Sequence, residues 1–221
     1  LKSKKRPLKG NRKELLWALP HSVQAILSFA RRLFYFLLAR TFVSQDISKI
    51  SGETIICSYF PNFDEKQYEN KIFTSKYWGN IPSALPGKIK SLNWLFFYAQ
   101  NNKYSFFQSL RIVRDMRNSD EFSGGYFLLD EFNTIGALRS ALQTYYRHRK
   151  IKKLVPSLRG LMIDTSNGAD YSMFFEELWK SSTVGFRAME NSLLSAIFCN
   201  LADQIENTKQ MLYPWENQSW E

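Results

Sequence analysis

The chain has 221 residues, 44% of them hydrophobic and 16% aromatic, which is enough to build a core without disulfides or metals and which disfavours a disordered chain. The net charge of +10 suggests nucleic-acid binding, but residues 1–13 and 139–159 hold 14 of the 30 basic residues and no acidic one. The remainder has 16 basic residues against 20 acidic ones and no nucleic-acid-binding motif, so we expect no nucleic-acid partner. Anionic lipid headgroups, a phosphorylated glycolipid or a nucleotide phosphate are better candidates than nucleic acid for binding to the two basic segments. A charged surface that only contacts water explains these segments equally well.

Residues 1–50 are predicted to form a basic leader followed by an amphipathic helix. Apolar side chains recur at helical spacing between residues 21 and 43. They are Val23, Ile26, Leu27, Ala30, Leu33, Phe34, Leu37 and Leu38. Arg31 and Arg32 interrupt the apolar run, which disfavours a transmembrane helix. The helix either packs on the rest of the protein or lies in a membrane interface beside the basic leader.

Residues 51–221 are predicted to form a Rossmann-like α/β domain, with a mostly parallel sheet flanked by helices. Short apolar runs at 54–60, 91–98 and 125–131 are typical of parallel strands that are buried on both faces. Two further strands are expected at 160–164 and 210–215. Helices are expected at 74–84, 105–117, 134–154 and 171–207.

Polar and aromatic residues follow the first, third and last of these strands, at the edge where parallel sheets bind ligands. The candidates are Asp64, Lys76, Tyr77, Trp78 and Asp130, and, after the last strand, Trp215, Glu216, Asn217, Trp220 and Glu221. Any one of them is more often a turn residue or a helix cap. Their accumulation at one edge favours a binding site.

Several kinds of chemistry lack their motifs. No Gly-rich phosphate loop follows a strand, and no Gly-x-Ser-x-Gly elbow is present, which disfavours a dinucleotide-binding dehydrogenase and a serine hydrolase. The two cysteines, Cys57 and Cys199, lie in apolar segments and match no metal-ligand spacing. We expect buried thiols in a reducing compartment, no metal site and no cofactor.

Five segments, taken in order, resemble bacterial surface carbohydrate biosynthesis proteins, which are similar to glycosyltransferases of the two-domain GT-B type. The segments are residues 58–61 (Ser-Tyr-Phe-Pro), 73–79 (Phe-Thr-Ser-Lys-Tyr-Trp-Gly), 93–95 (Asn-Trp-Leu), a series from Glu177 to Asn191 through Gly185, and 213–221. The resemblance covers roughly residues 50–221. It implies the acceptor-side half of such an enzyme, with Glu216 and Glu221 nearest the cleft between the two halves.

Glycosyl transfer requires that an acceptor hydroxyl be oriented and deprotonated, which a carboxylate can do. The resemblance therefore makes Glu216 and Glu221 the catalytic candidates, and the other candidate residues the substrate-binding ones. It implies a free or lipid-linked sugar acceptor, and a nucleotide-sugar donor held by a C-terminal domain that this sequence lacks. We expect no catalysis from this chain alone, and a location in the cytoplasm or at the inner membrane. A binding module for membrane surfaces or anionic ligands, without catalysis, is the alternative.

Overall fold

The computed structural model describes residues 19–42, 54–79, 92–99, 103–122, 124–154, 172–205 and 208–213. The chain forms two compact units. The first consists of residues 1–30 and 141–192, and the second of residues 31–140 and 193–221. The boundary at residue 50 predicted from the sequence remains a prediction.

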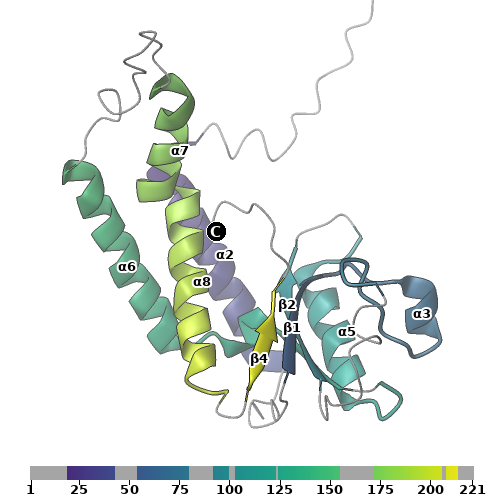
Figure 1. Cartoon of the computed structure of the whole chain (residues 1–221). Helices are drawn as coiled ribbons and strands as arrows, with labels where there is room; N and C mark the ends of the chain where they lie inside the picture. The colour runs from purple at the N-terminus through teal and green to yellow at the C-terminus, as the bar shows by residue number, and fades with distance from the viewer. Residues whose placement is uncertain are drawn as a thin grey trace, which may run out of the picture. The chain divides into compact units, whose positions relative to one another are not determined.

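The second unit contains a four-stranded sheet with the strand order β3-β2-β1-β4 (Figure 1). The strands are β1 (Thr54–Phe60), β2 (Leu92–Tyr98), β3 (Gly125–Leu128) and β4 (Gln210–Leu212). All three pairs of neighbouring strands are parallel. In the pair of β1 and β2, the first residues Thr54 and Leu92 lie opposite each other. The predicted Rossmann-like α/β fold, with a parallel sheet flanked by helices and a helix near the N-terminus, is confirmed.

The first three strands lie where the apolar runs predict them. The third is shorter than expected, because the 3-10 helix η2 (Leu129–Phe132) begins where the strand ends. The last strand ends at Leu212, and residues 214 and 215 of its predicted range lie outside the described residues. The strand expected at 160–164 also lies outside them.

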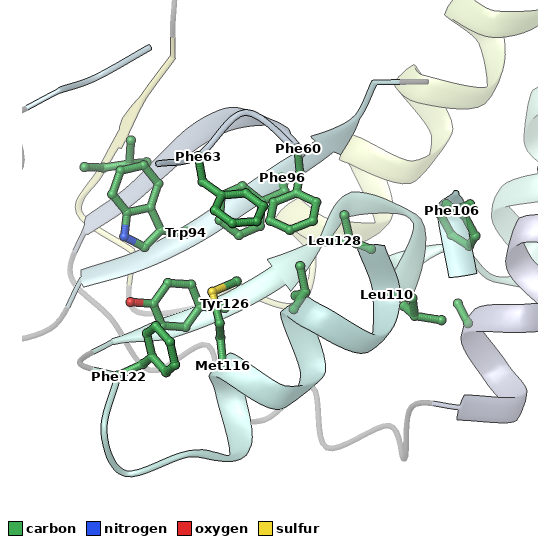
Figure 2. Packing of buried hydrophobic residues seen from close by; sticks show 13 residues of the cluster. Phe60, Phe63, Trp94, Phe96, Phe106, Leu110, Met116, Phe122, Tyr126 and Leu128 are labelled. Carbon is green, nitrogen blue, oxygen red and sulfur yellow. The ribbon is translucent and has the colours of Figure 1, made fainter. Parts of the chain in front are cut away.

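One face of the sheet packs against helix α5 (Phe106–Asn118). Leu110 and Met116 of this helix belong to one buried cluster with Phe96 and Tyr126 of the strands, and Figure 2 shows Met116 beside Tyr126. Ser105 starts the helix with a capping box, in which its hydroxyl accepts from the Gln108 amide while the Gln108 side chain accepts from the Ser105 amide. A cap and an apolar face together explain why the helix forms at the predicted place.

The opposite face of the sheet packs against the C-terminal part of helix α8 (Phe186–Ala202). Ile197 and Leu201 of this helix form a cluster with Leu95 of β2 and with Phe132 of η2. Alternate residues of each strand thus meet apolar side chains on both faces, as expected of a parallel sheet. This burial explains why the strands consist of continuous apolar runs.

Helix α2 (His21–Phe42) confirms the predicted helix, and the exposures of its apolar side bear on the two alternatives given for that side. Leu38 packs partly against the core, whereas Leu27 and Phe34 are exposed. The buried positions of the helix are the polar Gln24, Ser28 and Arg32 and the apolar Ala25, Phe36 and Ala39. Of the two alternatives, packing of the apolar stripe on the protein is therefore wrong for most of its members, and the membrane alternative stays a prediction.

The first unit is helical within the described residues, and includes α7 (Ser172–Val184) and parts of α2, α8 and α6 (Ile135–Leu154). The single helix expected at 171–207 is wrong, because the chain breaks at Gly185 into α7 and α8. A Cβ at Gly185 would lie 2.9 Å from the Ser181 Cα and 3.1 Å from the His21 Nδ1. Only glycine fits this close approach.

Three smaller features of the structure differ from what the sequence predicts. Residues 76–79 of the helix expected at 74–84 form a turn, and residues 80–84 lie outside the described residues. The short helix α3 (Glu65–Glu69) was not expected from the sequence. Cys57 is buried as expected, and burial raises its pKa to about 12, but Cys199 is exposed. The prediction of two buried thiols is therefore half wrong.

Two glycines should respond in opposite ways to alanine. Gly124 has a φ of 100°, and a Cβ there would lie 2.5 Å from the Leu92 carbonyl oxygen. We expect Gly124→Ala to lower the free energy of unfolding by about 2–4 kcal/mol, because it adds backbone strain and a clash with a strand. Urea denaturation measures the change.

Gly136 in α6 is the matched control, since the nearest atom to its Cβ would be the Thr134 Oγ1 at 3.6 Å. Gly136→Ala should raise the free energy of unfolding by up to about 1 kcal/mol, because alanine favours the helix and restricts the unfolded chain. Equal effects of the two substitutions would contradict this account of Gly124.

Candidate functional site

The carboxyl edge of the sheet has a topological switch point at β1. The chain passes from β1 to β2 and then to β3 on one side, and returns to place β4 on the other side. Ligands of open parallel sheets bind beyond the carboxyl ends of the strands at such a point. β4 pairs with β1 only as far as Leu212 opposite Ile56, so residues 57–60 of β1 continue beyond β4. The candidate site is this end of β1.

A turn at residues 75–79 covers the end of β1. The Trp78 Nε1 donates a hydrogen bond to the Cys57 carbonyl at 2.8 Å, one residue beyond the last β1–β4 pair. The Ser58 and Ser75 hydroxyls lie 2.9 Å apart and share a second hydrogen bond. The indole thus gives a hydrogen-bond donor to a β1 carbonyl that lies past the end of the pairing with β4. Trp78, predicted as a substrate-binding residue, is partly buried and anchors the turn through this contact.

The same turn presents Lys76 and Tyr77 at the surface. The backbone amide of Lys76 donates to the Asn62 carbonyl at 2.9 Å, which fixes the start of the turn while the lysine side chain remains exposed. The Tyr77 side chain is 43% exposed. The structure therefore places two predicted substrate-binding residues side by side on a turn that hydrogen bonds attach to β1.

Tyr77 lies at the end of a chain of aromatic rings. Its ring centroid is 5.3 Å from that of Tyr59, which is 5.8 Å from that of Phe97. Phe97 in turn contacts Tyr213 edge to face at 5.9 Å. Ring contacts of this kind orient aromatic side chains. Tyr77 therefore offers an exposed and positioned ring beside the strand β1, and the ring contacts connect it to Tyr213, the residue that follows β4.

Asp64 caps the helix α3. Its carboxylate accepts hydrogen bonds from the Lys66 and Gln67 amides at 3.0 and 3.3 Å. These contacts satisfy two of the amides that a helix leaves unpaired at its N-terminus. Its backbone amide also donates to the Thr74 carbonyl at 2.9 Å, which joins it to the segment that precedes the turn. The contacts of Asp64 are those of a helix cap near the site.

Asp130 forms a buried ion pair with Arg32. The Arg32 Nη1 lies 2.6 Å from the Asp130 Oδ1, and both side chains are nearly inaccessible to solvent. Asp130 follows β3, and β2 and β1 separate β3 from β4. Three strand spacings correspond to about 14 Å, so the end of β3, which Asp130 follows, lies that far from β4 along the edge. Its visible role is to hold α2 at the end of β3.

The neighbouring Glu131 forms a second buried ion pair. Its carboxylate accepts two hydrogen bonds from the Arg117 Nη2, at 2.6 and 2.7 Å, and one from the Leu128 amide at 2.8 Å. Burial raises the pKa of Glu131, and the Arg117 charge opposes that shift. The guanidinium also donates through its Nε to the Tyr126 carbonyl. This pair ties α5 to β3 and leaves the carboxylate no free approach for a substrate.

Asn133 is the residue at this edge that the sequence analysis missed most clearly. Its side chain is 1% exposed, and neither its amide nitrogen nor its amide oxygen has a partner among the described residues. The Asp130 Oδ2 is likewise buried without a partner there. An unpaired buried polar atom costs about 1–3 kcal/mol, so these atoms lower the stability of the segment that follows β3. No sequence signal distinguished Asn133 from an ordinary turn residue.

Arg32 and Tyr59 were also missed as contributors to the edge. The interruption of an apolar helix by Arg32 could have indicated a buried partner, because a charge in such a place must be paired. Tyr59 lies within the first apolar run, where strand formation alone explains an aromatic residue. The sequence does not identify the partner of either residue, because Arg32 contacts Asp130 and Tyr59 contacts Tyr77 and Phe97, which lie in other segments of the chain.

The predicted catalytic residues lie outside the described part of the chain. These catalytic candidates are Glu216 and Glu221. The predicted substrate-binding residues Trp215, Asn217 and Trp220 also lie outside the described part. Among the residues that the structure describes, no group of three or more His, Cys, Asp and Glu side chains is placed to hold a metal ion. The described part of the site thus consists of Lys76, Tyr77 and their supports.

Comparison with known proteins gives no relative. No protein-family model matches the chain, and neither a curated protein nor a solved structure does. The fold and the residues of the site therefore carry the functional argument.

The Arg32–Asp130 ion pair generates a stability prediction. Arg32→Met retains an apolar stem of similar length but leaves Asp130 without its cation inside the fold. Breaking a buried ion pair by removing one partner typically costs about 3–5 kcal/mol, and we expect a loss of that size in urea denaturation.

Arg40→Met in the same helix is the control, because Arg40 is exposed and its guanidinium lies over the Phe36 ring at 5.4 Å. That substitution should cost about 1 kcal/mol or less. A cost for Arg32→Met as small as that for Arg40→Met would show that Asp130 does not depend on Arg32.

Proposed function

We propose that this chain is the acceptor-side half of a GT-B-type glycosyltransferase in bacterial surface carbohydrate biosynthesis. One observation carries the proposal: the segment with the predicted catalytic carboxylates directly follows β4, which borders the switch point of the sheet. Glu216 is three residues beyond Tyr213 in the sequence. Tyr213 contacts the ring system that ends at Tyr77.

The proposed site divides the work between the turn and the segment after β4. The exposed ring of Tyr77 provides an apolar face for one side of an acceptor sugar, as aromatic residues commonly do for flat apolar surfaces. The Lys76 ammonium, exposed on the same turn, suits a phosphate if the acceptor is lipid-linked. Glu216 accepts the proton of the attacking hydroxyl, with Glu221 as the second candidate. The donor nucleotide sugar is held by the second domain that this mechanism requires.

The other candidates take supporting roles in this proposal. Asp64 caps α3, Trp78 anchors the turn and Asp130 holds Arg32, and each of these contacts is structural. These residues position the surface on which the acceptor binds. The proposal therefore places acceptor recognition chiefly on Lys76, Tyr77 and the segment after β4.

Sugar binding by the chain itself is the first test. Saturation-transfer NMR with a panel of common monosaccharides should detect at least one binder, and Tyr77→Ala should weaken that binding by about fivefold or more because it removes the aromatic face. Tyr146→Ala is the control, since Tyr146 is an exposed tyrosine on α6. Binding that is insensitive to Tyr77→Ala, or equally sensitive to both substitutions, would rule out the turn as the acceptor surface.

Glycosyl transfer by a protein that joins this chain to its donor-binding half is the second test. Glu216→Gln should reduce transfer by about a hundredfold or more if this carboxylate is the general base, while a thermal melt shows an unchanged fold. Glu69→Gln, an exposed change in α3, should leave transfer unaffected. Glu65 is a poorer control because its carboxylate contacts Lys103 and Tyr104. Full activity with Glu216→Gln would remove Glu216 from the mechanism.

A further inference from the structure

Helix α2 exposes its apolar side. Ile26, Phe34 and Leu37 are 65%, 56% and 54% exposed, although side chains of this kind normally face a core. The apolar face of α2 consists of Val23, Ile26, Leu27, Leu33, Phe34 and Leu37. With the exposed Ala30 between Leu27 and Leu33, these positions recur at intervals of three and four residues, so they share a side of the helix over about four turns. A contiguous exposed apolar surface of this kind marks an interaction site.

Polar contacts on the other side hold α2 in this orientation. The Gln24 side chain donates to the Leu19 carbonyl at 2.8 Å, and the Ser28 hydroxyl donates to the buried Glu190 carboxylate. Arg32 forms its ion pair with Asp130. Turning the apolar face inward would break a buried ion pair and leave both of its charges without partners. The exposure of the apolar face is therefore built into the fold.

The charge of this part of the chain identifies the occupant. Helix α2 has no acidic residue, and residues 1–42 together contain one acidic and ten basic residues, of which Arg32 alone is paired with Asp130 as described above. An apolar helical face that is accompanied by basic residues is the pattern of helices that lie in the interface of an anionic bilayer. A protein groove would have to be both apolar and acidic to match it.

We propose that α2 docks this protein on an anionic lipid bilayer, with the helix axis in the plane of the interface and the apolar face among the acyl chains. By length and composition alone, His21–Thr41 could also cross a membrane. A crossing helix would have lipid or other membrane-embedded elements on all sides, whereas Arg32 of α2 is joined to the end of strand β3. The fold thus permits one-sided insertion and excludes a span. This proposal does not depend on the proposed function.

Vesicle flotation with the whole chain tests the proposal. We expect the protein to float with vesicles that contain phosphatidylglycerol, and to bind pure phosphatidylcholine vesicles at least about tenfold more weakly. The double substitution Phe34→Ser and Leu37→Ser should weaken binding to the anionic vesicles by about tenfold or more, because two inserted apolar side chains are lost. Its melting temperature should match that of the wild-type chain, because both side chains are exposed.

The chain offers a matched control in α7, where Phe175 and Leu178 have the same residue types, the same spacing and exposures of 43% and 41%. Phe175→Ser with Leu178→Ser should leave vesicle binding unchanged. The proposal is overturned if the wild-type chain does not float with the anionic vesicles, if both vesicle types bind equally, or if both double variants lose binding equally. A lipid-free dimer that the Phe34 and Leu37 changes abolish would assign the face to a second copy of the chain instead.

Discussion

The buried ion pair between Arg32 and Asp130 determines how the N-terminal helix meets the sheet. Moving two charges out of water is costly, and the attraction between them offsets that cost only when the geometry is good. The 2.6 Å contact therefore fixes the middle of α2 to Asp130 in η2, the 3-10 helix that follows β3. A helix held by an inward arginine turns its opposite side outward, and on α2 that side carries Ile26, Phe34 and Leu37.

The sheet could be predicted from the sequence because its signal is local. Strands such as β1 and β2 are buried on both faces, and this requirement produces continuous apolar runs that few other structures share. The orientation of α2 could not be predicted, because the rule that apolar residues face the core has its exception where a buried charge has a partner. That partner, Asp130, is 98 residues away in the sequence. The break at Gly185 was missed for a similar reason, since it accommodates close contacts with Ser181 and His21.

For the candidate site, the sequence predicted the location but not the roles of single residues. Its location at the carboxyl edge followed from the alternation of strands and helices, which places the ends of parallel strands together. The roles of single residues did not follow, because an aspartate after a strand can cap a helix, as Asp64 does, or hold a distant arginine, as Asp130 does. Strand order separates these two cases. Asp130 lies three strands from β4, a distance that depends on which strands pair and that no local pattern encodes.

The two proposals meet in the second unit. The C-terminal half of α2 lies at the carboxyl edge of the sheet, since Arg32 reaches the residues after β3 and Tyr35 contacts Tyr98, the last residue of β2, at 5.7 Å. Phe34 lies between these two anchors in the sequence and faces outward. A bilayer that receives Phe34 would therefore lie near the edge at which the acceptor is proposed to bind. That arrangement favours an acceptor whose sugar is carried by a lipid in the same membrane, because such a substrate reaches the site without leaving the bilayer.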